Sequence, residues 1–421
     1  MAKQENPGDV KIIQAKLKSK ANGAEIDIRA QMIEVSIFED VDQPSLYCIV
    51  QLLDSLNLVE DFPIIGEETF TFTWLSAGRK EFSSCTFDVF SVDSLVAGPS
   101  GKEQQYTLHC VSPEHLISAS MSVVGTFRNT TDVIVRSVLE RYIGTKKILV
   151  AEESKGLAEV TLPNYTPFQT IDYLRQRSVS KLKDQPSSFF FFESQKGYHY
   201  ASLDYLIQQG IPDIKSKVFT FNENINSDKE REARSFRNLK QYLQLDTFDS
   251  IKKAAGGAMK GQTSALDIIS KDVEISGFNI DKQMKSIIGS DPKAAMSNSL
   301  EFMSAFVNNP KFKGKTNTVT KDKSKGNSFN EGAASIKDAL FQVLNNGPVR
   351  CLADGDNYLK AGDMIELNLP ENSGTSNSKG QNTLRSGNFF ITKLRHQILK
   401  DEKDFKYQCS WDCSRMGVQV K

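Results

Sequence analysis

The sequence predicts a mainly β protein of the α+β class. In this fold two small antiparallel β-barrels flank an α+β module, and a helical and loop segment is inserted into the second barrel. Apolar and polar residues alternate through residues 11–111, the apolar spacing becomes helical after Ser112, and the alternation returns within residues 334–421. Alternation with period two buries one face of a strand, whereas a spacing of three to four residues buries one face of a helix. These changes of period therefore indicate changes of domain.

The changes of pattern divide the chain into four parts. We expect residues 1–111 to form the first β-barrel and residues 112–210 to form the α+β module. The second β-barrel takes residues 211–248 together with residues 334–421, and residues 249–333 are the insertion. A chain of 421 residues is long enough to bury several cores of this size.

The first part is predicted to be β structure because its short alternating segments are separated by turn-rich pieces. The clearest segments are IEVSIFED (33–40), ETFTFTWL (68–75), FSSCTFDVFSV (82–92) and QQYTLHCV (104–111). Several short strands at such close spacing are typical of a small antiparallel barrel or sandwich.

The α+β module is predicted from helix start and stop signals. A Ser-Pro pair begins SPEHLISAS, and TDVIVRSVLERYIG (131–144) has an apolar stripe and a terminal glycine. A short strand, KILVA, precedes a third helix that opens at Thr166-Pro167.

A phenylalanine-rich hairpin follows this helix. SSFFFFES reads as a strand apolar on both faces, Gly197 turns the chain, and YHYASL returns. A strand buried on both faces has to lie under helices or another layer. We therefore expect a structural or interface role for the aromatic residues of the hairpin and of a late strand, together with the turn glycine: Phe189, Phe190, Phe191, Phe192, Gly197, Tyr198, Tyr200, Phe389, Phe390 and His396. Insertion of the four phenylalanines into a membrane is the rival interpretation.

The insertion is expected to be helical and loop-like. SDPKAAMSNSLEFMSAFVNN has a helical pattern, and the following residues 311–326 contain six lysines in sixteen positions. So many charges and so few apolar residues predict an exposed loop. A further helix, GAASIKDALFQVLNN, leads to the last β strands, among them AGDMIELNLP, GNFFITKLRHQI and FKYQCSWDC.

Composition and motifs argue against an enzyme. The 52 basic and 52 acidic residues cancel, so no overall field favours nucleic acid or an anionic membrane. No phosphate loop, nucleophile elbow or zinc motif is present, the four histidines define no metal site, and we expect no cofactor. The six cysteines do not form a disulfide framework in a chain of this length, and Cys48, Cys85 and Cys110, within strand-like runs, are expected to be small buried thiols. The start MAKQENPGDV lacks an apolar stretch, from which we expect folding in a cytoplasm.

TPFQTIDYLRQRS followed by SSFFFFESQKGYHYASLDYL resembles a segment of the baseplate hub proteins of contractile-tailed phages. This family includes the late-control tail proteins and the N-terminal part of the type VI secretion spike proteins. The matching residues are Phe190, Phe192, Glu193, Gly197, Tyr200, Ser202 and Leu203. AGDMIELNLP and SGNFFITKLRHQI are also similar to hub sequence, and the resemblance extends in order over residues 30–410.

The resemblance implies a structural protein of the virion tail. Hub proteins are homotrimers in which each subunit carries two tube-like barrels, so that six barrels form a pseudo-hexameric ring. Such a ring joins the hexameric tail tube, or a tube-initiator protein, to the trimeric central spike, contacts the baseplate wedge proteins and lets DNA pass. Neither catalysis nor stable insertion into a membrane is implied.

Three alternatives stay open at the level of sequence. The first is a hub or spike-base component of a type VI-like or tailocin injection machine. The second, from another class, is a β-domain hydrolase or carbohydrate-binding protein, which would need a carboxylate pair or an aromatic platform in a cleft. The third is nucleic-acid binding through the lysine-rich residues 311–325.

Overall fold

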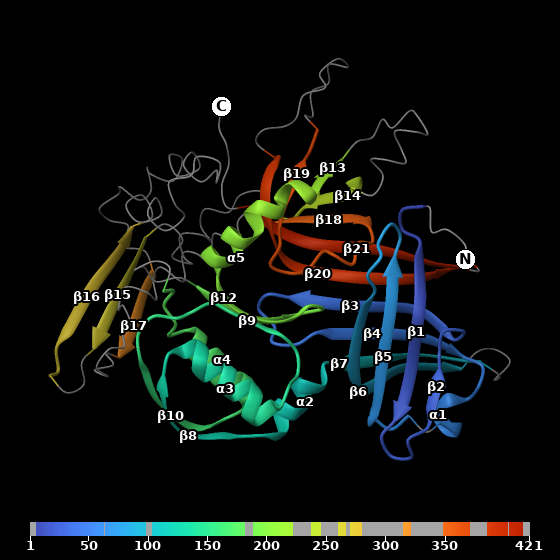
Figure 1. The fold of residues 1–421 in the computed structure, drawn as a ribbon, viewed down its shortest axis with the longest axis horizontal. Helices are drawn as coiled ribbons and strands as arrows, with labels where there is room; N and C mark the ends of the chain where they lie inside the picture. Colours follow the sequence, from blue (N-terminus) through green and yellow to red (C-terminus); the bar gives the residue numbers. More distant parts are fainter. Residues whose placement is uncertain are drawn as a thin grey trace.

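A computed structural model gives the architecture of the chain (Figure 1). The description covers residues 6–62, 64–97, 103–181, 188–221, 237–245, 260–266, 270–279, 315–320, 348–370, 385–402 and 404–415.

One thirteen-stranded sheet dominates the fold. Along its main path the strand order is β14-β18-β21-β20-β3-β4-β7-β6-β5-β1-β2, and β19 joins β13 to β20 beside this path. The strands of its N-terminal half are β1 (Val10–Ser19), β2 (Glu25–Asp27), β3 (Met32–Asp40), β4 (Tyr47–Asp54), β5 (Glu68–Ser76), β6 (Ser83–Ala97) and β7 (Gln104–Val111). The strands of its C-terminal half are β13 (Val218–Thr220), β14 (Leu239–Gln244), β18 (Val349–Asp354), β19 (Met364–Asn368), β20 (Gly387–Asp401) and β21 (Asp404–Arg415).

The two halves of the sheet have the same topology. β3-β4-β7-β6-β5 in the N-terminal half corresponds to β14-β18-β21-β20-β19 in the C-terminal half, and the strands of each set are also met in the same order along the chain. All neighbours within both sets are antiparallel. The correspondence ends at the next strand, since β1 is antiparallel to β5 but β13 is parallel to β19. We call the two sets the first and second β units.

The two β units are joined edge to edge. β3 of the first unit pairs with β20 of the second, with Lys393 opposite Asp40 and Leu399 opposite Glu34. A single cluster of buried apolar side chains extends across both units, from Ala15 to Cys413. The joint is therefore part of the core.

The prediction of closed barrels is not confirmed, because no sheet of the described residues closes on itself. Alternation along a strand identifies its buried face but does not identify the strand that lies beside it. Where closure of the first unit was expected, the edge of β3 is taken by β20 from more than 350 residues further along the chain. The coarser expectation of a mainly antiparallel α+β fold is confirmed.

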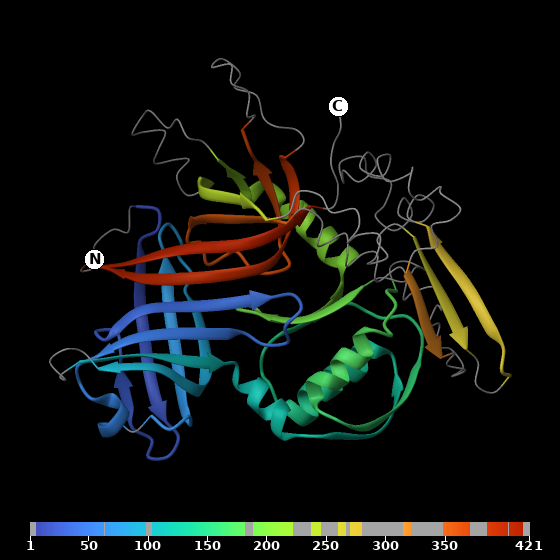
Figure 2. The ribbon, with the colours of Figure 1, turned by 180° about the vertical axis from the view of Figure 1, so that it is seen from behind.

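The α+β module lies against one end of the sheet (Figure 2). It contains a pair of strands, β8 and β10, and a three-stranded sheet in the order β11-β12-β9. The strands are β8 (Val123–Asn129), β9 (Leu149–Ala151), β10 (Ala158–Tyr165), β11 (Phe189–Ser194) and β12 (Gly197–Ser202). The helices are α2 (Pro113–Ser120), α3 (Thr131–Val138), which continues as a π-helical turn Leu139–Ile143, α4 (Pro167–Arg175) and α5 (Leu203–Gly210), which is followed by the 3-10 turn Ile211–Ser216. One short helix, α1 (Leu58–Asp61), lies in the first β unit.

Helix α4 begins where the sequence predicts. Thr166 accepts a hydrogen bond from the backbone N of Gln169 at 3.3 Å, and the Gln169 side chain accepts one from the Thr166 backbone at 3.0 Å. Pro167 at the first helical position completes this start, because the missing N–H is one that a helix leaves unpaired in any case.

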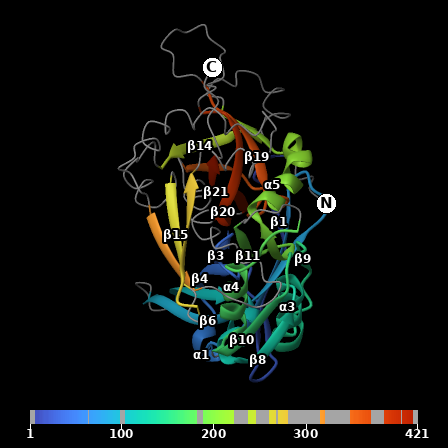
Figure 3. The ribbon, with the colours of Figure 1, turned by 90° about the vertical axis from the view of Figure 1, so that its left-hand side faces the viewer.

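Within the insertion the structure corrects the sequence prediction. A three-stranded sheet in the order β16-β15-β17 is formed by β15 (Lys260–Leu266), β16 (Val273–Asn279) and β17 (Lys315–Thr320), and it lies on the side of the molecule away from β1 (Figures 1 and 3). Thus part of the lysine-rich segment is a strand. Its sequence KTNTVT alternates β-branched residues, a pattern that the lysine count obscured. The two helices expected at residues 290–309 and 332–346 lie outside the described residues.

Candidate functional site

The hairpin β11-β12 carries its turn to the joint between the two β units. We call five side chains near this turn the junction: Glu193 and Gln195 of the hairpin, Lys147 of the loop before β9, Glu39 of β3 and His396 of β20. The junction links all three parts of the chain.

The hairpin is the one that the sequence predicts. Phe189 lies opposite Ser202 and Ser194 opposite Gly197, and all twelve strand residues are buried. One face packs on α4, where the rings of Phe191 and Tyr198 stack at 5.4 Å and the ring of Phe168 lies 5.8 Å from Phe191. The four phenylalanines of β11 are therefore part of the hydrophobic core.

Gly197 is required by the position of a neighbouring strand. Its φ is +120°, and a Cβ at this position would come within 2.4 Å of the carbonyl oxygen of Ile148. That same carbonyl accepts a hydrogen bond from the backbone N of Tyr198 at 2.8 Å, which fixes β9 beside β12.

Replacing Gly197 with alanine is expected to lower the free energy of unfolding by about 2–4 kcal/mol, because the backbone strain is added to the displacement of Ile148. Urea unfolding followed by circular dichroism measures this loss. Gly125→Ala is the matched control, since its φ is +145° and nothing lies within 4 Å of its Cβ position. Equal losses in the two variants would contradict the role of the Ile148 contact.

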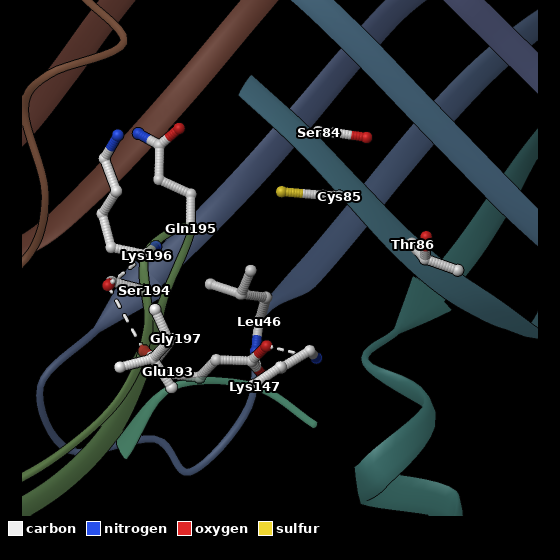
Figure 4. A pocket seen from close by; sticks show the side chains of 11 residues that line it. Leu46, Ser84, Cys85, Thr86, Lys147, Glu193, Ser194, Gln195, Lys196 and Gly197 are labelled. Carbon is white, nitrogen blue, oxygen red and sulfur yellow. Dashed lines mark hydrogen bonds and ion pairs between the residues drawn. The ribbon is translucent and has the colours of Figure 1, made fainter. Parts of the chain in front are cut away.

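Lys147 bridges two buried carboxylates. Its Nζ lies 2.6 Å from Glu193 of β11 and 2.6 Å from Glu114 of α2, and Glu193 also accepts a hydrogen bond from the backbone N of Leu46 at 3.1 Å (Figure 4). Burial raises the pKa of Glu193 although Lys147 opposes the rise. Burial alone would lower the pKa of Lys147, but Glu193 and Glu114 raise it. With its Nζ between two carboxylates, Lys147 stays charged and ties α2 to the hairpin, and Glu193 ties the hairpin to the loop before β4.

Glu39 ties the hairpin turn to both β units. Its carboxylate accepts hydrogen bonds from the backbone N of Gln195 at 2.9 Å and from the backbone N of Ala361 at 2.7 Å. Its Oε1 lies 3.7 Å from Nε2 of His396. The Gln195 side chain in turn donates to the carbonyl of Leu359 at 3.1 Å. One buried carboxylate therefore fixes three segments that are distant in sequence.

The groups around His396 favour its charged form. Burial would lower its pKa, but Cys409 and Glu39 together raise it to about 10. Its Nδ1 lies 2.7 Å from the hydroxyl of Tyr407 and 3.4 Å from the sulfur of Cys409. The sequence shows His396 as an isolated histidine, and only the fold brings these partners to it.

A cavity of about 220 Å³ opens beside the junction (Figure 4). The hairpin turn and the loop before β9 form one wall, and Cys85 of β6 points into it from the other. Of the charged residues that line it, Lys147 and Glu193 are paired with each other, and burial raises the pKa of Cys85 well above its usual range. Burial therefore keeps the Cys85 thiol in its neutral, less reactive form, and the paired charges hold the hairpin and the loop before β9 together.

The ten residues predicted as structural or interface positions are all buried. The structure brings His396 to the hairpin turn, where its Nε2 lies 3.3 Å from Nε2 of Gln195. Phe389 and Phe390 instead lie at the start of β20, opposite Ile365 and Met364 of β19. An assembly role for these ten residues stays a prediction, and any surface offered to a partner comes from other side chains.

Sequence reasoning missed Glu39. The signal was available in MIEVSIFED, where Val35, Ile37 and Glu39 share the inward face of an alternating strand. A carboxylate in a buried position has to be paired or hydrogen-bonded, so this position could have been identified as structurally important.

His199 gives the fold a pH dependence of its own. Burial lowers its pKa to about 3, and its ring stacks on Phe192 at 4.8 Å. An unfolded histidine has a pKa near 6.5, so the unfolded chain takes up the proton first as the pH falls. The stability that the neutral ring contributes is present above about pH 6.5 and is lost toward pH 3, by up to about 1.4 kcal/mol per pH unit.

Replacing His199 with glutamine is expected to remove this part of the acid sensitivity. The free energy of unfolding of the variant and of the wild type should converge as the pH falls from 7 to 4. Urea unfolding at several pH values measures the difference, and a constant difference over this range would contradict the proposed burial of a neutral His199.

Among the described residues no group of three or more histidine, cysteine, aspartate or glutamate side chains is placed to hold a metal ion. In the same part of the chain no helix has the length and apolar character needed to cross a membrane. The six cysteines are buried and form no disulfide.

Comparison with known proteins places the fold. No protein-family model matches the chain, and no curated protein matches it by sequence. The tail protein from Neisseria meningitidis MC58 superposes with a TM-score of 0.54 at 10% identity, over 96% of this chain and 97% of that chain. The 43 kDa tail protein of prophage MuSo2 from Shewanella oneidensis also gives a TM-score of 0.54 at 10% identity, over 96% and 98% of the two chains. A half-lidded Francisella PdpA-VgrG complex gives 0.47 at 8% identity, over 98% of this chain and 59% of that chain.

The two tail proteins share the fold of this chain over nearly its whole length. The resemblance to tail proteins seen in the sequence is confirmed at the level of the fold. At 10% identity the likeness extends to architecture only.

Proposed function

We propose that the chain is a structural hub of a contractile phage tail baseplate. Three copies would form a pseudo-hexameric ring that joins the hexameric tail tube to the trimeric central spike. The observation that carries this proposal is the whole-length likeness to two tail proteins, combined with the repeated strand order of the two β units. A trimer of chains with two like units presents six similar positions to a six-fold partner and three to a three-fold partner.

The junction supports a role that depends on rigidity. A protein that couples two large assemblies has to hold its own parts in fixed relation. Here Glu39 and Lys147 anchor the module to the joined β units through buried hydrogen bonds and ion pairs. Groups of this kind lock a geometry when all of them are satisfied.

The face of the sheet opposite the core is suited to the lumen of such a ring. A row of alternating charges crosses four strands and the joint: Arg350 of β18, Asp412 of β21, Lys393 of β20 and Asp40 of β3. Arg350 is paired with Asp412 at 2.7 Å and Lys393 with Asp40 at 2.9 Å. Cations that are already matched by carboxylates hold phosphate groups weakly, and this favours passage of DNA over its retention.

The remaining partners follow from this placement. The tail tube, or a tube-initiator protein, would stack on one side of the ring and the spike on the other. Baseplate wedge proteins would surround it, with the module and the insertion outside the ring. The protein would then be part of the virion tail, assembled in the host cytoplasm.

Electron microscopy of the purified protein tests the proposal. Class averages should show a ring with an open centre, three-fold symmetric in its periphery and nearly six-fold in its inner wall. Averages that show a solid particle without rotational symmetry would overturn the hub assignment.

A further inference from the structure

The first and second β units agree in register as well as in strand order. In β3 an irregularity lies between Met32 and Glu34, and in β14 one lies between Leu239 and Gln241. The residues of β4 that lie opposite the irregularity in β3 occupy the same positions as the residues of β18 that lie opposite the irregularity in β14.

The long strands β6 and β20 agree as far as Asp93, beyond which β6 has a second irregularity, between Asp93 and Val96, that β20 lacks. An irregularity separates Val89 from Ser91 in β6 and Ile391 from Lys393 in β20. The last residue of β6 that pairs with β5 is Asp88, and the last residue of β20 that pairs with β19 is Phe390. Counting from these points, Val92 corresponds to Leu394 and Asp93 to Arg395.

The joint inside the chain uses one end of this repeat. β3, the end strand of the first unit, pairs with the half of β20 that β19 leaves free, from Lys393 to Leu399. In the repeat, β14 is the end strand of the second unit and the counterpart of β3. The half of β6 beyond Asp88 is the counterpart of the free half of β20. Among the described residues β14 pairs with β18, Asn238 directly before it forms an isolated bridge with Thr220 of β13, and this half of β6 pairs with β7 alone.

Exposure marks these two edges as incomplete. At the joint Leu394 is 2% exposed, and Ser36, the counterpart of Leu243, is 0% exposed. On the free half of β6, Val92, the counterpart of Leu394, is 37% exposed and Val96 is 62% exposed. On β14 and directly after it, Leu243 is 53% and Leu245 is 41% exposed. Apolar edges of this kind are prone to pair with another strand.

The two edges belong to opposite parts of the sheet. Six strands separate β14 from β6 in the strand order, and the described residues of the two edges do not pair with each other within the chain (Figure 1). We propose that β14 of one copy pairs antiparallel with the free half of β6 of a second copy, repeating between chains the β3-β20 joint within the chain. In this register Leu245 lies opposite Asp93 of the neighbouring copy, as Phe38 lies opposite Arg395 within the chain.

The contact is heterologous, because it uses different surfaces on the two copies, and such contacts close into a ring or extend without limit. The proposal rests on the proposed function for closure at three copies. It adds the strands and the register by which the copies meet, and it extends one sheet around the whole ring.

Disulfide trapping tests the register. Residues directly opposite in an antiparallel pair have Cα atoms about 4.5–5.5 Å apart, within the range for a disulfide. The double variant Asp93→Cys with Leu245→Cys should therefore form covalent dimers and trimers on mild oxidation, seen by denaturing electrophoresis without reductant. The natural cysteines are all buried, so they give little background. Val124→Cys with Leu245→Cys is the control, because Val124 is 65% exposed on β8, outside the proposed contact.

A second pair of variants tests the contact without new covalent bonds. Val96→Lys should weaken association roughly tenfold or more, since it places a charge on the exposed apolar edge near the end of β6. Val124→Lys, at a matched exposure of 65%, should leave the solution mass unchanged.

The outcomes separate the two proposals. Trimers that crosslink through residues 93 and 245 and are weakened by Val96→Lys support both. Trimers that neither crosslink at these positions nor respond to Val96→Lys overturn the strand contact and leave the ring in place. Monomers that do not crosslink overturn the ring and the contact together.

Discussion

Replacing Glu39 with alanine is expected to lower the free energy of unfolding by about 3–5 kcal/mol. The variant leaves the backbone N–H groups of Gln195 and Ala361 without their acceptor, at a cost of about 1–3 kcal/mol for each buried group. It also removes the carboxylate that faces the buried ring of His396. Urea unfolding followed by tryptophan fluorescence measures the loss.

Glu39→Gln should lose less than Glu39→Ala, because the amide keeps one oxygen that can accept a backbone hydrogen bond. Glu153→Ala is the control. Its carboxylate pairs with Lys181 at 2.5 Å on the surface, where its side chain is 72% exposed, and no measurable loss is expected there. A loss at Glu39 no larger than the loss at Glu153 would contradict the junction as the link between the three parts of the chain.

Replacing Phe192 with alanine is expected to lower the free energy of unfolding by about 3–5 kcal/mol, the usual range for a buried phenylalanine. Its side chain is 0% exposed and lies between the stacked ring of His199 and the chain at Gly362, where a Cβ would meet its ring at 2.9 Å. The cavity would open between the hairpin and the second β unit, so it weakens the attachment of the module as well as its core.

Phe82→Ala is the matched control for this variant, since the Phe82 side chain is 64% exposed. Its effect should stay within about 0.5 kcal/mol. Thermal unfolding of both variants measures the comparison. If Phe192→Ala unfolds at the same temperature as Phe82→Ala, the four-phenylalanine strand is not the buried element described above.

Local elements could be predicted from the sequence because their signals lie within a few residues. The start of α4 follows from Thr166, Pro167 and Gln169, which are adjacent in the chain. The hairpin follows from an apolar run and Gly197, and the structure shows the predicted strands. The mainly β character followed in the same way from alternation along each strand.

The sequence could not reveal which edges meet. The joint between β3 and β20 pairs residues more than 350 positions apart, and alternation gives no information on the neighbour of an edge strand. The partners of His396 were hidden for the same reason, since Glu39 and Gln195 come from the other two parts of the chain. The strand at Lys315–Thr320 was missed because its lysine-rich surroundings outweighed its own pattern.

The repeat of strand order and register connects fold and proposed function. A joint already present inside the chain, between β3 and β20, shows how one β unit accepts the edge of another. The same type of edge is left open at β14 and at the far half of β6. A ring of three chains satisfies every such edge with one kind of contact, and it removes the open strands that would otherwise favour aggregation.

The solution mass of the purified protein, measured by light scattering over a dilution series, tests the central claim most directly. A hub ring predicts three times the mass of one chain, unchanged on dilution, because the large interfaces of a permanent oligomer do not dissociate readily. A mass equal to one chain at every concentration would contradict the ring and, with it, the assignment of this fold to a baseplate hub.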